Sequence, residues 1–215
     1  MTVAVKICGL STEETLEAAL DAGADVVGFV SFPKSPRHVE LDRLAALAAT
    51  VGQRARIALL TVDADDALLT ALTAVAAPHV LQLHGSESPE RVRELKERFG
   101  REVWKAVAIS ESADLARAEP YWSVADRVLF DAKPPKGSAL PGGNGVAFDW
   151  RLLAGLDPRR PFVLSGGLNP ENVAEAVRVT RAPVLDVSSG VESAPGVKSP
   201  ERIAAFIEAA RAEPA

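Results

Sequence analysis

The sequence predicts an α/β protein built as a single-domain (β/α)₈ TIM barrel that spans residues 1–215, and three observations lead to this prediction. Eight short apolar segments alternate with helical stretches rich in Ala, Glu and Arg. The segments recur about every 27 residues, which is the length of one βα unit with its loops. Most of them are apolar almost throughout, which indicates parallel strands buried on both faces. A chain of 215 residues has the length of one such barrel.

The eight segments expected as strands follow one another along the whole chain. They are Val3–Cys8, Val26–Val30, Arg56–Val62, His79–His84, Glu102–Ile109, Arg127–Asp131, Pro161–Leu164 and Pro183–Val187. An open, doubly wound sheet is the alternative architecture. No G-x-G-x-x-G motif follows the first strand, so the dinucleotide-binding version of that sheet loses support. We therefore expect the closed barrel.

Capping signals mark where helices are expected to begin. Ser11 followed by Glu14 reads as a capping box, and the segment 169–171, Asn-Pro-Glu, places a proline at the first helical position. Gly23 is expected to end the first helix. At the end of the chain, residues 211–215 are expected to fray.

Composition and charge exclude several classes of partner. The net charge of −5 and an aromatic content of 5% argue against a nucleic-acid-binding protein, which needs basic stripes with aromatics. No segment reaches the ~18 consecutive apolar residues of a membrane helix. The short apolar start is interrupted by Lys6 and does not read as a signal peptide. With a single cysteine, the expected location is the reducing cytoplasm.

The lone cysteine, Cys8, lies at the carboxyl end of the first expected strand, where barrels place their chemistry. A single thiol forms no internal disulfide and no Cys-based zinc site alone. Cys8 is therefore either a small buried hydrophobe or a catalytic acid–base group or nucleophile. Lys6, two residues earlier, points to the same face of the strand. Its ammonium would lower the pKa of the thiol, unless Lys6 is paired with an acidic side chain inside the barrel.

Glycines and serines follow the last two expected strands. In barrels these two loops frequently hold a phosphate group, because backbone N–H groups approach an anion closely where no Cβ intervenes. The alternative is that the glycines only form tight turns. The expected phosphate-binding residues are Gly166, Gly167, Ser188, Ser189 and Gly190.

Three further side chains lie at expected strand ends. Arg37 carries a planar fork that matches a carboxylate, although an arginine in a loop is often only solvated. Asp131 ends an apolar strand, where burial favours the protonated form that a general acid needs; a structural hydrogen-bond acceptor is the alternative. His84 is interpreted as a wall residue behind the reacting groups. The three histidines are scattered along the chain, so we expect no metal.

Six motifs together carry a family resemblance. KICGL, GFVSFPKSPRHV, LQLHGSE, GGNGVAFDW, LSGGLNPENV and DVSSGVESAPGVKS occur in this order from residue 5 to about residue 206. The set resembles the phosphoribosylanthranilate isomerase family of tryptophan biosynthesis, whose members are (β/α)₈ barrels. The resemblance implies an Amadori rearrangement, without cofactor or metal, of N-(5-phosphoribosyl)anthranilate to 1-(2-carboxyphenylamino)-1-deoxyribulose 5-phosphate, so that a phosphorylated small molecule is the partner.

The resemblance also implies roles for individual residues. Cys8 matches the family's general base, Asp131 its general acid and Arg37 its contact to the anthranilate carboxylate, while Asp186 matches a position near the sugar. Lys6 and His84 are expected to support these groups. Where the family usually reads Gly-Gly-Thr-Gly, this chain has Asn144 in place of the threonine, so the contacts of that loop are left open.

Two rival functions and the oligomeric state are also left open. An aminoaldose isomerase of the histidine pathway uses the same barrel, but with a carboxylate where this chain has Cys8. A non-catalytic phosphosugar-binding barrel is the rival from another class, and it would not need both Cys8 and Asp131. The sequence is compatible with a monomer and with a homodimer.

Overall fold

The computed structural model describes residues 3–135, 137–138, 140, 142–143, 145, 147–157 and 159–212. Within these residues, eight parallel strands pair in sequence order and close into a barrel. They are β1 (Ala4–Cys8), β2 (Val26–Ser31), β3 (Arg56–Thr61), β4 (Val80–Leu83), β5 (Glu102–Ile109), β6 (Arg127–Ala132), β7 (Phe162–Leu164) and β8 (Val184–Val187). Each expected strand is confirmed to within one residue at either end.

Pairing between the first and the last strand closes the barrel. Lys6 of β1 lies beside Asp186 of β8 on one side and beside Val26 of β2 on the other. The alternative of an open doubly wound sheet is therefore wrong, because such a sheet leaves two edge strands unpaired.

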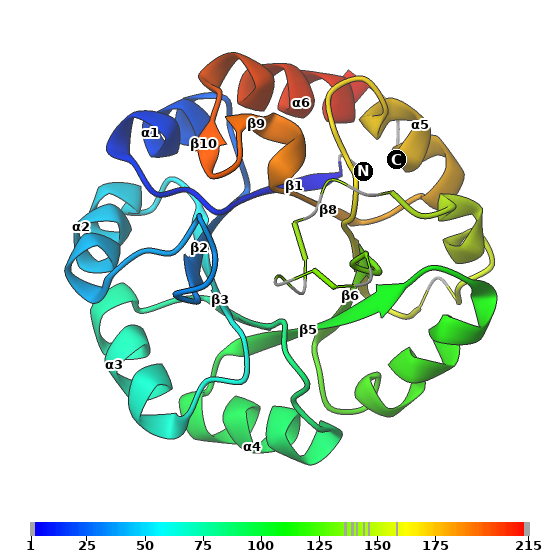
Figure 1. The fold of residues 1–215 in the computed structure, drawn as a ribbon, viewed down its shortest axis with the longest axis horizontal. Helices are drawn as coiled ribbons and strands as arrows, with labels where there is room; N and C mark the ends of the chain where they lie inside the picture. The colour runs from blue at the N-terminus through cyan, green and yellow to red at the C-terminus, as the bar shows by residue number, and fades with distance from the viewer. Residues whose placement is uncertain are drawn as a thin grey trace.

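Helices surround the strands as an outer ring (Figure 1). The α-helices are α1 (Glu13–Asp21), α2 (Leu41–Val51), α3 (Asp66–Ala76), α4 (Pro89–Phe99), α5 (Val173–Thr180) and α6 (Pro200–Ala212). After β5, β6 and β8 the chain forms the 3₁₀ helices η1 (Ser112–Tyr121), η2 (Trp150–Leu153) and η3 (Ser189–Val191), and a hairpin of β9 (Glu192–Ala194) and β10 (Val197–Lys198) precedes α6. In the described chain, no helix is both long enough and apolar enough to cross a membrane.

Two helices begin later than their capping signals suggest. The N-cap of α1 is Thr12, whose hydroxyl accepts the N–H of Thr15, so the prediction of Ser11 is wrong by one residue. The N-cap of α5 is Asn172, whereas the Asn169 side chain accepts the N–H groups of Glu171 and Asn172 and stabilises the turn before the helix. The side chain of Asn172 accepts the N–H of Asn169 and caps no N–H of the helix, so the two asparagines close the turn that precedes α5.

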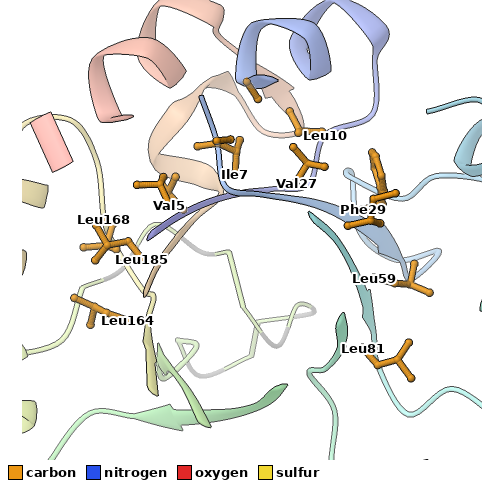
Figure 2. Close-up of a cluster of buried hydrophobic side chains, with 14 of the residues drawn as sticks. Val5, Ile7, Leu10, Val27, Phe29, Leu59, Leu81, Leu164, Leu168 and Leu185 are labelled. Carbon is orange, nitrogen blue, oxygen red and sulfur yellow. The ribbon is translucent and has the colours of Figure 1, made fainter. Parts of the chain in front are cut away.

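The alternation along the strands separates a shell of apolar side chains from the barrel interior. Val5 and Ile7 of β1 and Val27 and Phe29 of β2 point toward the helices, where they are buried (Figure 2). Side chains of the opposite parity point inward. At the amino ends of the strands these are apolar and form the floor of the barrel: Val26, Ala58, Val80, Trp104, Leu129, Val163 and Val184. The polar inward positions therefore lie above this floor, toward the carboxyl ends.

Candidate active site

One cavity at the carboxyl ends of the strands collects most of the residues that the sequence singled out. Its open space of about 760 Å³ includes solvent outside the mouth. Its lining includes Cys8, Arg37, His84, Asp131, Gly166, Gly167, Asp186, Ser188 and Ser189. Lys6 and Gly190 are not part of this lining. The barrel thus brings together side chains that are up to 181 positions apart in the sequence.

Cys8 ends β1 and is only 3% exposed. Burial raises the pKa of its thiol above the ordinary value of 9.0, the Lys6 ammonium lowers it, and the Asp186 carboxylate raises it again, with a net increase. The expected effect of Lys6 is present, but burial outweighs it. The free protein therefore holds Cys8 as the neutral thiol at neutral pH.

Lys6 forms a buried ion pair inside the barrel. Its Nζ lies 2.6 Å from Oδ1 of Asp186, and both side chains are buried. Burial lowers the pKa of Lys6, but Asp186 and Cys8 raise it by more, so that Lys6 remains an ammonium. Of the two arrangements expected from the sequence, the structure has the one in which Lys6 pairs with an acidic side chain inside the barrel.

Gly28 of β2 makes room for this group. A Cβ at Gly28 would lie 3.0 Å from Nζ of Lys6 and 3.1 Å from Cα of Cys8. Gly28 was assigned no role from the sequence. A glycine within an apolar strand nevertheless indicates that another part of the chain packs closely against the backbone at that position.

Asp131 and His84 contact each other across the cavity. Nε2 of His84 lies 3.2 Å from Oδ2 of Asp131, while Oδ1 accepts the N–H of Ala132 at 2.8 Å. Gly142, from the segment after β6, lies against both side chains, so closely that a Cβ there would clash with them. The proposed acid is thus held by a histidine that the sequence placed only in the cavity wall.

Arg37 is already bound to a carboxylate of the protein. Its Nε donates to Oε1 of Glu192 at 2.7 Å and its Nη2 to Oε2 at 2.8 Å, and Nη2 also donates to the carbonyl of Gly143. Nη1 makes no hydrogen bond with the described residues. The two-pronged face that was expected to match a substrate carboxylate is therefore occupied, and Nη1 is the nitrogen left for a ligand.

Glu192 and Lys198 extend this contact into a buried network. Nζ of Lys198 lies 2.6 Å from Oε1 of Glu192 and donates to the carbonyl and hydroxyl of Ser188. Burial raises the pKa of Glu192, but Arg37 and Lys198 lower it by more, so that Glu192 is a carboxylate. Neither residue was recognised from the sequence, although a Glu and a Lys that flank a Pro-Gly turn after the last strand are a visible signal.

Residues of the loops after β7 and β8 line the cavity, among them Gly166, Gly167 and Ser189. Gly166 and Gly167 adopt φ angles of +82° and +68°, which favour glycine. Their N–H groups, and that of Ser189, donate no hydrogen bond within the described chain. Backbone N–H groups without a partner at a cavity wall suit an anion.

Two members of the expected phosphate site have other contacts. The hydroxyl of Ser188 donates to the carbonyl of Cys8 at 3.0 Å, so it ties β8 to the end of β1. Gly190 is not part of the cavity lining, and its Cα packs against the carbonyl of Leu168.

Asn144 lies outside the described residues. Across the residues that are described, no group of three or more His, Cys, Asp or Glu side chains could hold a metal ion.

The closed barrel of eight parallel strands, with a cavity at the carboxyl ends of its strands, defines a (β/α)₈-barrel protein. Residues 5–209 match the family model described as N-(5'-phosphoribosyl)anthranilate (PRA) isomerase. The chain belongs to this family of isomerases, which act in tryptophan biosynthesis, and the resemblance seen in the sequence motifs is confirmed.

Curated relatives and solved structures agree with this assignment. The N-(5'-phosphoribosyl)anthranilate isomerase of Azorhizobium caulinodans is 60% identical over 99% of this chain and 93% of its own length. The phosphoribosyl anthranilate isomerase of Thermotoga maritima superimposes with a TM-score of 0.89 at 36% identity, covering 98% of this chain and all of that chain. A family structure in complex with reduced 1-(o-carboxyphenylamino)-1-deoxyribulose 5-phosphate has a TM-score of 0.86 at 34% identity, with 98% and 100% coverage.

Proposed function

We propose that this barrel converts N-(5-phosphoribosyl)anthranilate to 1-(2-carboxyphenylamino)-1-deoxyribulose 5-phosphate by an Amadori rearrangement, with Asp131 as general acid and Cys8 as general base. The observation that carries the proposal is that Cys8 and Asp131 line one cavity, together with the glycines of the loop after β7 and Ser189 of the loop after β8. An aldose-to-ketose shift needs one acid, one base and an anchor at each end of the substrate. The proton transfers need no cofactor and no metal.

The reaction divides into two proton transfers. Asp131 donates a proton to the ribose ring oxygen, the bond from that oxygen to C1' breaks, and the anilino nitrogen supplies the electron pair of the resulting Schiff base. The Cys8 thiolate then removes the proton from C2'. The electron pair of that C–H bond forms the C1'–C2' double bond of an enolamine, which tautomerises to the ketose.

Anchors at the two ends hold the substrate between these groups. The N–H groups of Gly166, Gly167 and Ser189 converge on the phosphate, and Nη1 of Arg37 binds the anthranilate carboxylate. Ser188 acts through its hydrogen bond to the Cys8 carbonyl, and Gly190 through the packing of the loop behind the phosphate. Lys6 and Asp186 form a buried ion pair below the sugar. His84 holds the carboxyl group of Asp131.

The buried thiol predicts how this reaction depends on pH. Because the pKa of Cys8 is raised by burial, the thiolate is a minor species at neutral pH. A thiolate with a raised pKa is also a stronger base once formed. The proposal therefore requires a rate that increases toward alkaline pH.

All the residues in this proposal come from one barrel, residues 1–215, so it requires neither a second domain nor a partner subunit. It applies to a monomer and to a homodimer. The Thermotoga maritima enzyme is described as dimeric.

Anthranilate fluorescence tests the proposal directly. Phosphoribosylanthranilate should disappear faster with the protein than in buffer, and Cys8→Ala and Asp131→Ala should each lower turnover by ~10²–10⁴-fold. Both variants should still bind the reduced product analogue, because the anchors are intact. Near-complete turnover by Cys8→Ala would contradict the assignment of the base. Binding of the analogue without any catalysis by the unmodified protein would favour a phosphosugar-binding barrel instead.

A further inference from the structure

Gln82 lies on the inward face of the barrel wall, in a position that neither the anchors nor the proton transfers explain. It belongs to β4, between the strands that carry Leu60 and Trp104. Its side chain is fully buried, yet it lines the same cavity as Cys8 and Asp131. The alternation of β4 places Gln82 on the inward face, one step below His84.

The two ends of the Gln82 amide have different surroundings. Nε2 lies 3.4 Å from Nδ1 of His84. Oε1 is buried and has no hydrogen-bond partner among the described residues. If the amide oxygen and nitrogen exchange places, one amide atom still contacts His84 and the other still has no hydrogen-bond partner among the described residues. A buried polar atom without a partner is costly and uncommon in native proteins.

The contact to His84 also determines what the other amide atom can accept. When Nε2 donates to Nδ1 of His84, the imidazole proton resides on Nε2, which faces Oδ2 of Asp131 at 3.2 Å. Gln82 lines the cavity, and its amide oxygen is then a neutral acceptor without a partner among the described residues. It requires a donor, and a phosphate or a carboxylate offers none.

We propose that Gln82 contacts the substrate and that its Oε1 accepts a hydrogen bond from a hydroxyl group of the sugar chain. This inference rests on the proposed function. The phosphate is expected at the loops of β7 and β8 and the anthranilate carboxylate at Arg37, so the sugar chain spans the middle of the cavity. Its hydroxyl groups are the donors that pass the β4 wall, above the Lys6–Asp186 pair.

A double-mutant cycle between protein and ligand tests this contact. The probes are reduced 1-(o-carboxyphenylamino)-1-deoxyribulose 5-phosphate and three congeners, each lacking one sugar hydroxyl. Calorimetry gives the Kd of each probe for the unmodified protein, for Gln82→Met, which keeps the length of the side chain, and for Gln82→Glu, which keeps an acceptor oxygen. Gln53→Met, at an exposed position, is the control.

One hydroxyl should be coupled to Gln82. Removing it should weaken binding to the unmodified protein roughly tenfold, the scale of one net hydrogen bond, but by less than twofold in Gln82→Met. Gln82→Glu should retain the dependence on this hydroxyl, and Gln53→Met should behave as the unmodified protein. Equal losses in the unmodified protein and in Gln82→Met for all three congeners would overturn the inference.

A spectroscopic measurement on the unmodified protein gives an answer even if Gln82→Met does not fold. The ¹³Cδ resonance of Gln82 should move downfield when the parent probe binds, and it should not move with the congener that lacks the coupled hydroxyl. An unchanged resonance with the parent probe would contradict the contact. If the unmodified protein does not bind the parent probe at all, it is the proposed function that fails.

Discussion

Replacing Glu192 by glutamine should test the buried network that holds Arg37. Glu192 receives two hydrogen bonds from Arg37, at 2.7 and 2.8 Å, and one from Lys198 at 2.6 Å. Glutamine has nearly the same shape but carries no charge. The substitution therefore leaves two buried cations next to each other without the anion between them.

The size of the effect follows from the burial of the three groups. Their side chains are 6%, 4% and 1% exposed for Arg37, Glu192 and Lys198. Breaking such a buried pair by removing one partner costs ~3–5 kcal/mol. Burial already lowers the pKa of Lys198, so that this lysine can lose its proton and relieve part of the repulsion. We therefore expect a loss in the free energy of unfolding near the lower limit, about 3 kcal/mol.

Urea denaturation and steady-state kinetics measure the two consequences. The midpoint of unfolding should shift to lower urea, and KM should increase more than kcat decreases, because Arg37 loses the contact that holds it at the cavity. Glu171→Gln is the matched control. It removes an ion pair with Arg202 at 3.2 Å in which Glu171 is 66% exposed, and it should cost less than ~1 kcal/mol.

The pH dependence gives a second check on the same substitution. The pKa of Glu192 is lowered from 4.5 in the folded protein, so its contribution to stability is present above 4.5 and is lost as the pH falls through the folded-state pKa. The difference between the unmodified protein and Glu192→Gln should therefore become smaller in acid. If Glu192→Gln and Glu171→Gln lose the same free energy of unfolding at neutral pH, the buried network does not stabilise the protein as described.

Two further predictions concern Cys8 and its surroundings. The value of kcat/KM should increase as the pH rises through the raised pKa of Cys8. Cys8→Asp should move this increase to lower pH. A pH profile that is the same in both proteins would exclude Cys8 as the titrating base. Gly28→Ala should lower both the melting temperature and turnover, because its Cβ would lie 3.0 Å from Nζ of Lys6. Gly155→Ala, where a Cβ meets no atom within 4 Å, should change neither, and equal melting temperatures for the two variants would contradict the steric argument.

Local signals predicted the strands well and the helix starts less well. Each barrel strand is a short apolar run that ends in a Gly, Pro or polar residue, so its limits are visible in the sequence. The start of α5 is different. The side chains of Asn169 and Asn172 both accept N–H groups of the turn before the helix, and only the folded turn shows that Asn172 is the residue that precedes α5.

For the candidate site, most of the residues singled out from the sequence line one cavity, but not all of their partners were visible in the sequence. Strand counting placed Cys8 and Asp131 at the carboxyl ends because parity and strand length are local properties. The carboxylate that binds Arg37 lies 155 positions away, and no spacing rule connects two such residues. The partnerless oxygen of Gln82 is likewise visible only when every neighbour in the barrel is known.

The sequence by itself determined the barrel, its strand order and the family, because the alternation of apolar and helical segments and the motifs at the strand ends are written along the chain. Only the tertiary structure decided the electrostatics of the cavity. Burial raises the pKa of the Cys8 thiol despite the nearby Lys6, and Glu192 takes the fork of Arg37. Desolvation and ion pairing depend on three-dimensional proximity, which closure of the barrel creates between distant parts of the chain.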